Sequence, residues 1–484
     1  MGDLLLALDL GTTGVRALLV EPAAKTGALV RGRRYRPLPV AFPAPGRVEQ
    51  DPEVLFSRSV EVLSGALAEG GAAASDVAAL GIATQRATAL CWDARSGKPL
   101  APALGWQDQR LATGIRKLRE AGLPLSTQPS LAKFLWWLEE EPAVQAAARA
   151  GTLRLGTPDV WIQHRLSGGA VQVTDPGQAG CTALYDPSAG DWASGLAESL
   201  GIDLAALPAI VPTAGVVGET APGILGAAVS LAARAGDQQA AAFAAGLRAP
   251  GQAKLTLGTA AMVDLHTGAR PATPTPGTVP LPLWRLPVGG ESHCLEGHVA
   301  TAGAALEWGV GLGLAPDVPA LERLAMHVSD SAGVVAVPAF QGLGTPHALE
   351  SARGLIGGLT RGSTAAELAR ALFEGVAQRC VDVWEALGPS DPVLRADGGL
   401  ARSRLMLQCL ADLSGRTVEP AREVEGTALG AAALAALALD PDGEPARLGG
   451  PGEPVEPRMG EDQRCAARAR WAAIVPHRLR EDAP

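Results

Sequence analysis

The 484-residue chain contains few cysteines and no spacing that binds zinc. Neither a CxxC pair nor a Cys/His zinc pattern occurs. The six cysteines are Cys91, Cys181, Cys294, Cys380, Cys409 and Cys465. Because disulfide frameworks and structural zinc sites depend on such spacings, we expect reduced and mostly buried thiols.

The chain also lacks a run of Lys or Arg, and its formal net charge is −9 at pH 7. Nucleic-acid binding relies on clustered cations, so this balance argues against a general nucleic-acid binder. The longest apolar block, at 427–439, is too short to span a bilayer. The N-terminal apolar run carries Asp3 and Asp9 without the basic segment that a secretory signal requires. We expect a soluble, cytoplasmic protein whose partners are small molecules, without nucleic acid or membrane.

Two common phosphate-binding loops are missing as well. The nearest Gly-Lys pair, Gly97-Lys98, precedes proline and forms no Walker A loop, and no convincing GxGxxG turn joins a strand to a helix. The seven histidines form no ligand-like cluster, and no Ser-His-Asp or Cys-His set is visible. The histidines are therefore expected to be structural, and a phosphate site must use another kind of loop.

What the chain does contain is the pattern of an α/β protein with more than one domain. Hydrophobic residues make up 47% of it, and its length exceeds one ordinary core. Strand-like runs alternate with helical ones. Residues 4–8 and 15–20 flank Gly-Thr-Thr-Gly as an antiparallel hairpin, and 253–268 repeats this pattern near mid-chain. We predict domains at 1–248 and 249–445, followed by a surface tail at 446–484 with one short helix.

Further elements are expected along the chain, each bounded by turn or capping residues. They are a helix at 53–69 after Asp51-Pro52, a strand at 77–85, a strand, turn and strand at 89–100, a helix at 130–145 interrupted at Pro142, and a strand, Gly-Gly turn and helix at 396–415.

Three features carry candidate chemistry. Each Gly-Thr turn exposes N–H groups and hydroxyls to which phosphate can bind, although either turn alone is better explained as an ordinary hairpin. The Gly398-Gly399 turn either admits a ring or phosphate or is a plain strand-to-helix connection. Asp237, at the expected start of a helix, is either an N-cap or a carboxylate general base with Gln238 beside it.

The order of these motifs resembles that of the FGGY carbohydrate kinases, most closely their glycerol kinase branch. The resemblance runs from Leu6 to about Leu439. The matching segments are DLGTTGVR (9–16), RVEQDP (47–52), GIATQR (81–86), WDARSGKPL (92–100), GWQDQR (105–110), GDQQAA (236–241), LGTAAM (257–262), AGAALEW (302–308), VPAFQGLGTP (337–346), GLIGGLTRGSTAAELARALFE (354–374), DGGLARS (397–403) and TALGAA (427–432).

The resemblance implies two ribonuclease-H-like domains of the actin and hexokinase type, with ATP and Mg²⁺ bound in an interdomain cleft. The γ-phosphoryl group would pass to a hydroxyl of a polyol or sugar. By position, Thr12, Thr13, Gly14 and Arg16 would contact phosphates, Asp9 would lie near the metal, Thr259, Gly303 and Gly399 would belong to the nucleotide site, and Arg86, Trp106, Asp237 and Gln238 would face the acceptor, with Asp237 as general base. Homodimers and homotetramers both occur in such a family, and no segment marks an interface.

Several positions depart from the glycerol kinase pattern. Ala87 replaces a hydroxyl-binding glutamate, Gln128 replaces a tyrosine, and Met262 replaces an aromatic residue. These changes enlarge the acceptor pocket, so glycerol, a longer polyol and a ketose all remain open as acceptors. Glu307 and Ser403 stand where Gln and Asn are usual near the nucleotide.

Two other functions share some of these features. A kinase-fold sensor or regulator would bind sugar or nucleotide without efficient transfer, which would suit the altered acceptor pocket. An actin-like or chaperone-like ATPase would keep the two Gly-Thr turns. The segments GDQQ, WQDQR and 354–374 argue against the ATPase.

Overall fold

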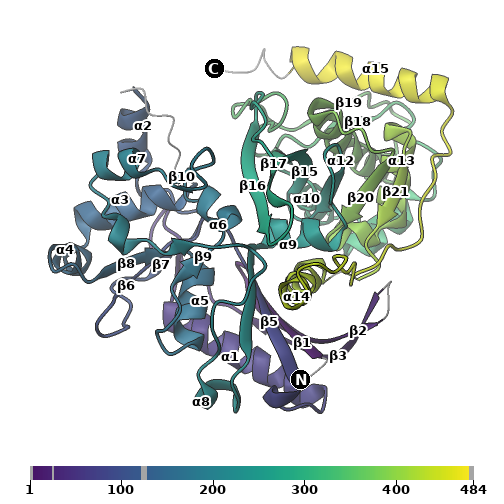
Figure 1. Cartoon of the computed structure of the whole chain (residues 1–484). Coiled ribbons are helices and arrows are strands. Elements are labelled where there is room, and N and C mark those ends of the chain that lie inside the picture. Colours follow the sequence, from purple (N-terminus) through teal and green to yellow (C-terminus); the bar gives the residue numbers. More distant parts are fainter. Residues whose placement is uncertain (1–3, 24–26, 121–127, 424, 479–484) are drawn as a thin grey trace. The chain divides into compact units, whose positions relative to one another are not determined.

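The computed structural model describes the chain except for residues 1–3, 24–26, 121–127, 424 and 479–484. The chain divides into two compact units (Figure 1). Unit 1 comprises Met1–Gly246, Leu281–Ser292 and Thr427–Gly449, and unit 2 comprises Leu247–Pro280, His293–Gly426 and Gly450–Pro484.

Unit 1 is built around a five-stranded sheet with the order β13-β5-β1-β2-β3. Its elements are β1 (Leu4–Leu10), β2 (Gly14–Ala23), β3 (Gly27–Pro37), β4 (Glu49–Gln50), α1 (Pro52–Glu69), η1 (Ala74–Asp76), β5 (Val77–Thr84), β6 (Leu90–Asp93), β7 (Ala103–Leu104), α2 (Ala112–Glu120), α3 (Ser130–Glu140), α4 (Pro142–Arg149), β8 (Leu153–Gly156), α5 (Pro158–Leu166), β9 (Val173–Thr174), α6 (Pro176–Gly180), β10 (Tyr185–Asp186), β11 (Asp191–Trp192), α7 (Ser194–Ser199), η2 (Leu204–Ala206), β12 (Ala209–Ile210), α8 (Pro222–Leu225), β13 (Ser230–Gly236), α9 (Asp237–Ala244) and α14 (Gly426–Leu439).

Unit 2 is built around a six-stranded sheet with the order β16-β17-β15-β14-β20-β21. Its elements are β14 (Ala253–Leu257), β15 (Ala261–Gly268), β16 (Thr278–Leu286), β17 (Gly290–Val299), α10 (Gly303–Gly311), α11 (Val318–Ala325), β18 (Val335–Val337), β19 (Leu355–Gly357), α12 (Ala365–Leu387), β20 (Val393–Asp397), η3 (Gly399–Arg402), α13 (Arg404–Ser414), β21 (Thr417–Pro420) and α15 (Glu461–Arg478). The last part of β16, from Leu281, and the first part of β17, to Ser292, belong to unit 1.

The two sheets share one topology. In unit 1, β1 pairs antiparallel with β2 and parallel with β5, and β13 continues parallel beyond β5. In unit 2, β14 pairs antiparallel with β15 and parallel with β20, and β21 continues parallel beyond β20. The repeated Gly-Thr hairpin in the sequence is therefore the first part of a repeated fold.

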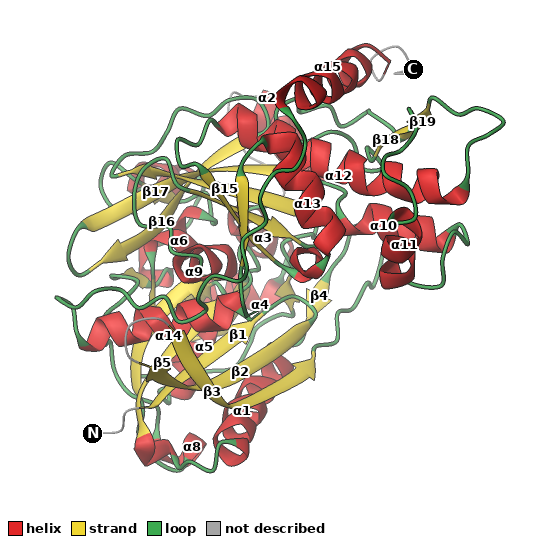
Figure 2. Cartoon of the chain, turned by 90° about the vertical axis from the view of Figure 1, so that its right-hand side faces the viewer, coloured by secondary structure: helices red, strands yellow, loops and turns green. Residues whose placement is uncertain are grey.

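The principal helices have capping residues that their sequences supply. The Asp51 carboxylate accepts the backbone N–H of Glu53, and Pro52 occupies the first turn of α1. Figure 2 shows α1 against β1, β2 and β3, which it contacts. In α12, Thr364 and Glu367 form a capping box. The expected helix at 130–145 is interrupted at Pro142, where α4 begins.

One expected element is shorter than predicted. Residues 89–100 were expected as strand, turn and strand, but after β6 the chain returns only as a single bridge between Trp92 and Pro99. Proline has no N–H for a ladder, which limits the return strand. The turn itself is held by Asp93, whose carboxylate accepts the backbone N–H of Ser96.

The described part of the predicted tail, 446–478, is more than a surface segment. Helix α15 has 18 residues and packs in unit 2, where Trp471 is only 4% exposed. The Trp471 indole donates to Asp382 Oδ2 at 2.9 Å, and Arg468 pairs with Asp382 Oδ1 at 2.9 Å. A buried tryptophan and a paired arginine make this helix part of the core of unit 2.

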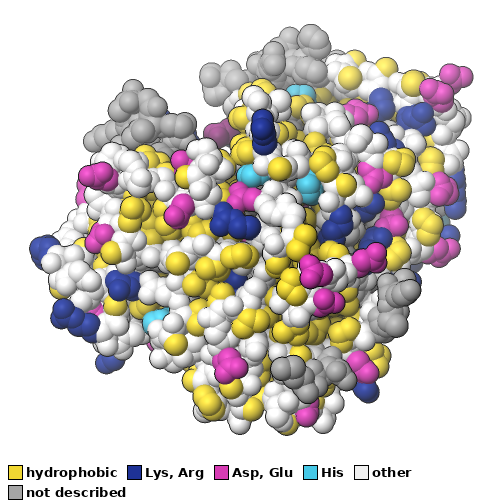
Figure 3. Space-filling view, viewed as in Figure 1, with side chains coloured by type: hydrophobic (Ala, Val, Ile, Leu, Met, Phe, Trp, Pro, Cys, Tyr) yellow, Lys and Arg dark blue, Asp and Glu magenta, His cyan; other side chains and the backbone are white. Residues whose placement is uncertain are grey.

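The surface and the cysteines agree with the composition. All six cysteines are free thiols, five of them buried and Cys465 exposed. On the face in Figure 3, basic and acidic side chains lie interspersed. Among the described residues, no helix is both long and apolar enough to cross a membrane.

Helix α14 belongs to unit 1, although the sequence-based boundary placed residues 427–445 in the second domain. Its glycine at 430 lies directly against α9, since a Cβ there would be 1.8 Å from the Ala240 carbonyl oxygen. A second glycine, Gly81 of β5, lies equally close to α14, with a hypothetical Cβ 2.0 Å from the Ala431 oxygen. At both contacts a glycine lets the backbone of one segment pack directly against the backbone of another. These contacts place α14 in unit 1.

Gly430→Ala is expected to destabilise the chain, because backbone must move to admit the methyl group. Overpacking of this kind costs about 1–3 kcal/mol. The matched control is Gly195→Ala in α7, where a Cβ would meet nothing within 4 Å. Urea unfolding followed by circular dichroism measures both variants. An unchanged midpoint for Gly430→Ala would contradict the close packing.

Candidate phosphate and acceptor site

The candidate residues of unit 1 emerge from one edge of its sheet. Strands β1, β5 and β13 run parallel, and Leu10, Thr84 and Gly236 occupy the same cross-strand row. Each is the last residue of its strand. The segments that follow them carry the Gly-Thr turn, the Arg86 turn and Asp237. In α/β sheets, ligands bind beyond the carboxyl ends of parallel strands.

The first Gly-Thr turn has its carbonyl groups engaged and its donors available. The Thr12 oxygen accepts Gln50 Nε2 at 2.8 Å, and the Thr13 oxygen accepts the Leu38 N–H at 2.9 Å. Among the described residues, neither the Thr12 nor the Thr13 backbone N–H has an acceptor. This arrangement presents donors to an anion while turning the carbonyl oxygens away from it.

Asp9 and Arg16 face each other across the hairpin. They are partners in the β1–β2 register, with Arg16 Nη1 3.7 Å from Asp9 Oδ2. The Arg16 guanidinium also lies 5.7 Å from the centre of the Tyr35 ring. A Cβ on Gly14 would come within 2.4 Å of that ring, so glycine is needed there for Tyr35 to pack. Nothing in the sequence pattern pointed to Tyr35, because only the β2–β3 register brings it here.

Asp237 and Arg86 meet at the same edge of the sheet. Arg86 Nε lies 3.5 Å from Asp237 Oδ1, and the backbone N–H of Gln238 donates to Asp237 Oδ1 at 2.8 Å. Gly236 is the N-cap of α9 and Asp237 the first helical residue, so the N-cap interpretation of Asp237 is wrong. A Cβ on Gly236 would lie 2.9 Å from the Arg86 side chain. The glycine therefore lets Arg86 lie across the start of the helix.

The turn that carries Arg86 is held by buried polar groups. Gln85 donates its backbone N–H to the Leu10 oxygen at 2.8 Å, and its amide nitrogen donates to Gln50 Oε1 at 2.8 Å. Ala87 has a φ of 60°, a conformation that alanine seldom adopts. The neighbours of Ala87 on both sides, Gln85 and Thr88, form buried hydrogen bonds that hold the turn.

Trp106 connects the turn that carries Arg86 and Thr88 to the first Gly-Thr turn. Its indole Nε1 donates to Thr12 Oγ1 at 3.1 Å, and its backbone N–H donates to Thr88 Oγ1 at 3.3 Å. Lys133 of α3, which sequence patterns did not single out, is 2% exposed. Its amine donates to the carbonyl oxygens of Gln128 and Trp106. The Gln128 backbone and the Trp106 loop are thus joined by one buried amine.

In unit 2, the second Gly-Thr turn is held by the start of α10. The Thr259 oxygen accepts the N–H groups of Ala302 at 2.9 Å and Ala304 at 3.2 Å, and the Gly303 N–H donates to the Gly258 oxygen at 2.9 Å. A Cβ on Gly303 would lie 2.7 Å from that oxygen. Thr259 and Gly303 therefore lie side by side.

The Gly-Gly turn leaves the same edge of the unit 2 sheet. Strands β14 and β20 run parallel, with Thr256 opposite Asp397. Gly398 has a φ of 90°, and a Cβ there would lie 2.4 Å from the Leu257 oxygen. Nothing lies within 4 Å of a Cβ on Gly399. The first glycine thus packs on β14, and the second leaves open space beside the turn.

Three residues of unit 2 that depart from the expected pattern, Ser403, Met262 and Glu307, lie in different local settings. Ser403 caps α13 by accepting the Met406 N–H at 3.0 Å. Met262 stands opposite Thr256 in the β14–β15 register. Glu307 is exposed on α10.

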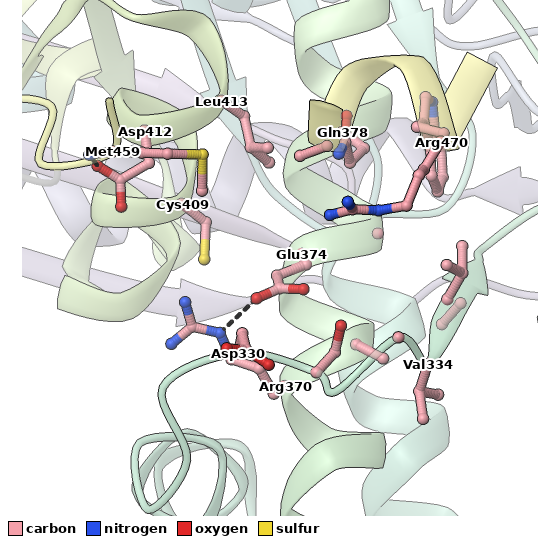
Figure 4. A pocket seen from close by; sticks show the side chains of 18 of the residues that line it. Asp330, Val334, Arg370, Glu374, Gln378, Cys409, Asp412, Leu413, Met459 and Arg470 are labelled. Atoms are coloured by element: carbon pink, nitrogen blue, oxygen red, sulfur yellow. Dashed lines mark hydrogen bonds and ion pairs between the residues drawn. The ribbon is translucent and has the colours of Figure 1, made fainter. Parts of the chain in front are cut away.

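A cavity of about 530 Å³ lies elsewhere in unit 2, between β18, α12, α13 and α15 (Figure 4). Its lining includes the ion pair between Arg370 Nε and Glu374 Oε1, at 2.7 Å, and the buried thiol of Cys409. None of the candidate site residues lines it. Within the described part of the chain, no group of three or more His, Cys, Asp or Glu side chains is arranged to hold a metal ion.

Solved structures with the same architecture define the class. The glycerol kinase of Plasmodium falciparum with ADP superposes with a TM-score of 0.89 at 24% identity, covering 98% of this chain and 97% of that one. The molecule therefore has the two-domain α/β fold of the sugar kinases.

Sequence comparison defines the family. Residues 4–244 match the N-terminal domain and 253–439 the C-terminal domain of the FGGY family of carbohydrate kinases. A glycerol kinase of Aromatoleum aromaticum is 41% identical, with 97% of this chain and 98% of the relative covered, and one of Thermus brockianus is 40% identical, with 97% of each covered. The chain belongs to the FGGY family and is a carbohydrate or polyol kinase, which confirms the resemblance seen in its sequence.

Lys133 makes stability depend on pH. Burial lowers the pKa of its amine from 10.5 to about 7, against an opposing effect of Asp108. Between these values the unfolded chain holds a proton that the folded chain lacks, so this group makes the free energy of unfolding rise with pH, by at most about 1.4 kcal/mol per pH unit. Thermal unfolding of Lys133→Met should show a shallower rise across this range, whereas exposed Lys98→Met should keep it. Equal slopes for Lys133→Met and the wild type would contradict the shift.

Proposed function

We propose that this kinase transfers the γ-phosphoryl group of ATP to a hydroxyl of a small polyol or sugar, with Asp237 as the general base. The observation that supports this most is the common row of Leu10, Thr84 and Gly236. It brings a donor-rich turn, an arginine and a carboxylate to one edge of unit 1. Phosphoryl transfer needs this combination, because it depends on positioning and charge stabilisation more than on covalent chemistry.

Asp237 would accept the proton of the attacking hydroxyl as the bond to phosphorus forms. Its side chain is 31% exposed, so an acceptor molecule can reach it. One carboxylate oxygen is oriented by the Gln238 N–H at 2.8 Å. Arg86, whose Nε lies 3.5 Å from Asp237 Oδ1, would contact the acceptor. Trp106 and the Gln238 side chain would complete the acceptor contacts.

The phosphates would be bound by the donors of Thr12 and Thr13, with Gly14 and Arg16 beside them. Asp9 fits the role of a magnesium ligand, since Mg²⁺ in kinases is held by one or two carboxylates together with phosphate oxygens and water. The Asp9 side chain is 16% exposed, and Asp9 is the second-last residue of β1, close to the turn. When bound, Mg²⁺ would neutralise phosphate charge.

Unit 2 would hold the rest of the nucleotide. Its Gly-Thr turn at Thr259 and the open side of Gly399 offer the backbone approach that a phosphate or a flat base requires. Gly303 would contribute by permitting α10 to start directly on the turn.

The acceptor is best sought among glycerol, larger polyols and ketoses. The curated relatives are glycerol kinases. Ala87, Gln128 and Met262 nevertheless remove a carboxylate and two aromatic side chains that glycerol kinases use. A sensor without transfer activity is not favoured, because Asp9, Asp237 and both turns are retained.

Asp237→Asn is expected to reduce kcat by about 10²–10⁴-fold, because the amide cannot accept the proton. ADP affinity, measured by titration calorimetry, should stay within about twofold, since the hydrogen bond from Gln238 can be kept. Asp442→Asn, an exposed loop substitution, is the control. Near-normal turnover in Asp237→Asn would rule out Asp237 as the base.

A coupled assay of ADP release over a panel of polyols and ketoses, starting with glycerol, identifies the acceptor. We expect turnover with at least one of them. If a larger acceptor is preferred, Ala87→Glu should lower its kcat/KM relative to that of glycerol by roughly 10-fold or more, since it restores a carboxylate and narrows the space. If the wild-type protein binds nucleotide but releases no ADP with any acceptor of the panel, the sensor function would be favoured.

A further inference from the structure

Trp106 and Thr12 belong to a closed ring of hydrogen bonds in unit 1. The Trp106 indole donates to Thr12 Oγ1 at 3.1 Å, and Gln50 Nε2 donates to the Thr12 oxygen at 2.8 Å. Gln85 Nε2 donates to Gln50 Oε1 at 2.8 Å, and Thr88 Oγ1 donates to Gln85 Oε1 at 3.1 Å. The Trp106 backbone N–H closes the ring by donating to Thr88 Oγ1 at 3.3 Å.

The connecting side chains of this ring are shielded from water. Gln50 is 3% exposed, Gln85 1% and Thr88 0%. Buried amides and hydroxyls must find partners, so an arrangement that satisfies each of them fixes which way each group points. Lys133 supports the ring from outside by donating to the Trp106 carbonyl oxygen at 3.5 Å. Trp106 is therefore held at its backbone N–H, its carbonyl oxygen and its indole.

The chemistry of the indole determines the direction of the Thr12 hydroxyl. An indole nitrogen can only donate, so Thr12 Oγ1 must accept this bond and its own proton points elsewhere. No acceptor for that proton exists among the described residues. This hydroxyl hydrogen lies on the same turn as the Thr12 and Thr13 backbone N–H groups, which also have no acceptor among the described residues.

We infer that Trp106 is a positioning residue for the phosphate turn: its indole N–H aims the Thr12 hydroxyl proton at a nucleotide phosphate, through the ring that Gln50, Gln85 and Thr88 complete. This inference rests on the proposed function, because it takes the Thr12 turn as a phosphate site and Trp106 as an acceptor contact. It adds that one side chain serves both sites.

A consequence is energetic coupling between the two ligands. An acceptor that contacts Trp106 stabilises the ring and, with it, the orientation of the Thr12 hydroxyl. The nucleotide must in turn favour the same Trp106 position, because linkage between two binding equilibria is reciprocal.

The test is a double-mutant cycle on nucleotide affinity, measured by titration calorimetry with a non-hydrolysable ATP analogue and Mg²⁺. Trp106→Phe keeps an aromatic ring but removes the N–H, and Thr12→Val removes the hydroxyl while keeping its shape. Each should weaken affinity by roughly fivefold or more, the usual size of one lost hydrogen bond. The double variant should be no weaker than Thr12→Val alone, because both changes remove the same donor.

Three further variants test whether the effect is purely structural. Trp136→Phe removes an indole N–H from α3, where the ring packs against Arg110 rather than Thr12, and should leave affinity unchanged. Thr88→Val opens the ring and should weaken nucleotide binding, whereas Thr88→Ser keeps the hydroxyl and should restore it. Circular dichroism and thermal unfolding verify that each variant is folded.

Two results would overturn the inference: unchanged nucleotide affinity in Trp106→Phe, or losses that multiply in the double variant. If the first result came with a raised acceptor KM, Trp106 would be an acceptor contact and not a positioning residue for the phosphate turn. Since the cycle needs binding and not turnover, it is separate from the proposed transfer reaction. If the wild-type protein binds nucleotide but phosphorylates no acceptor, the proposed function is refuted. The cycle would still decide whether the Trp106 indole and the Thr12 hydroxyl are coupled in nucleotide binding.

Discussion

The alignment of three parallel strands in unit 1 is the constraint on which the candidate site depends. Leu10, Thr84 and Gly236 end β1, β5 and β13 in one row, so the residues after them leave the sheet together. Arg86 and Asp237, which are 151 positions apart in sequence, thereby meet at 3.5 Å. Backbone pairing inside a buried sheet is rigid, and this rigidity lets short turns hold Asp237, Arg86 and Thr12 in defined positions.

Unit 2 repeats this arrangement of parallel strands and turns with different residues. Its sheet repeats the hairpin and the parallel strands, and again two glycine turns leave one edge. Here the turn at Thr259 has its carbonyl oxygen bonded to the start of α10, whereas the carbonyls of the first turn are bonded to Gln50 and Leu38. One topology therefore supports two turns in which carbonyl oxygens are neutralised by neighbouring N–H groups, an arrangement suited to anions.

Much of the site was visible in the sequence because its motifs are short and local. The Gly-Thr hairpins, the helix at 53–69, the break at Pro142 and the start of α9 near Asp237 all follow from neighbouring residues. The resemblance to the FGGY kinases then assigned roles to these positions. Local sequence patterns could not reveal partners brought by pairing between distant segments. Tyr35 lies beside Arg16 because of the β2–β3 register. The side chains of Gln50, Gln85 and Thr88 come together in one hydrogen-bonded ring only in the folded chain.

The sequence by itself determined the family, the α/β class, the two hairpins and the chemical types at the site, because each rests on contiguous residues. Tertiary structure alone decided that α14 returns to unit 1, that α15 packs against α12 through Trp471, and that the Trp106 indole meets the Thr12 hydroxyl. The physical reason is close packing: whether Gly430 admits a carbonyl oxygen, or an indole finds an acceptor, depends on atoms from distant segments, which a linear pattern does not contain.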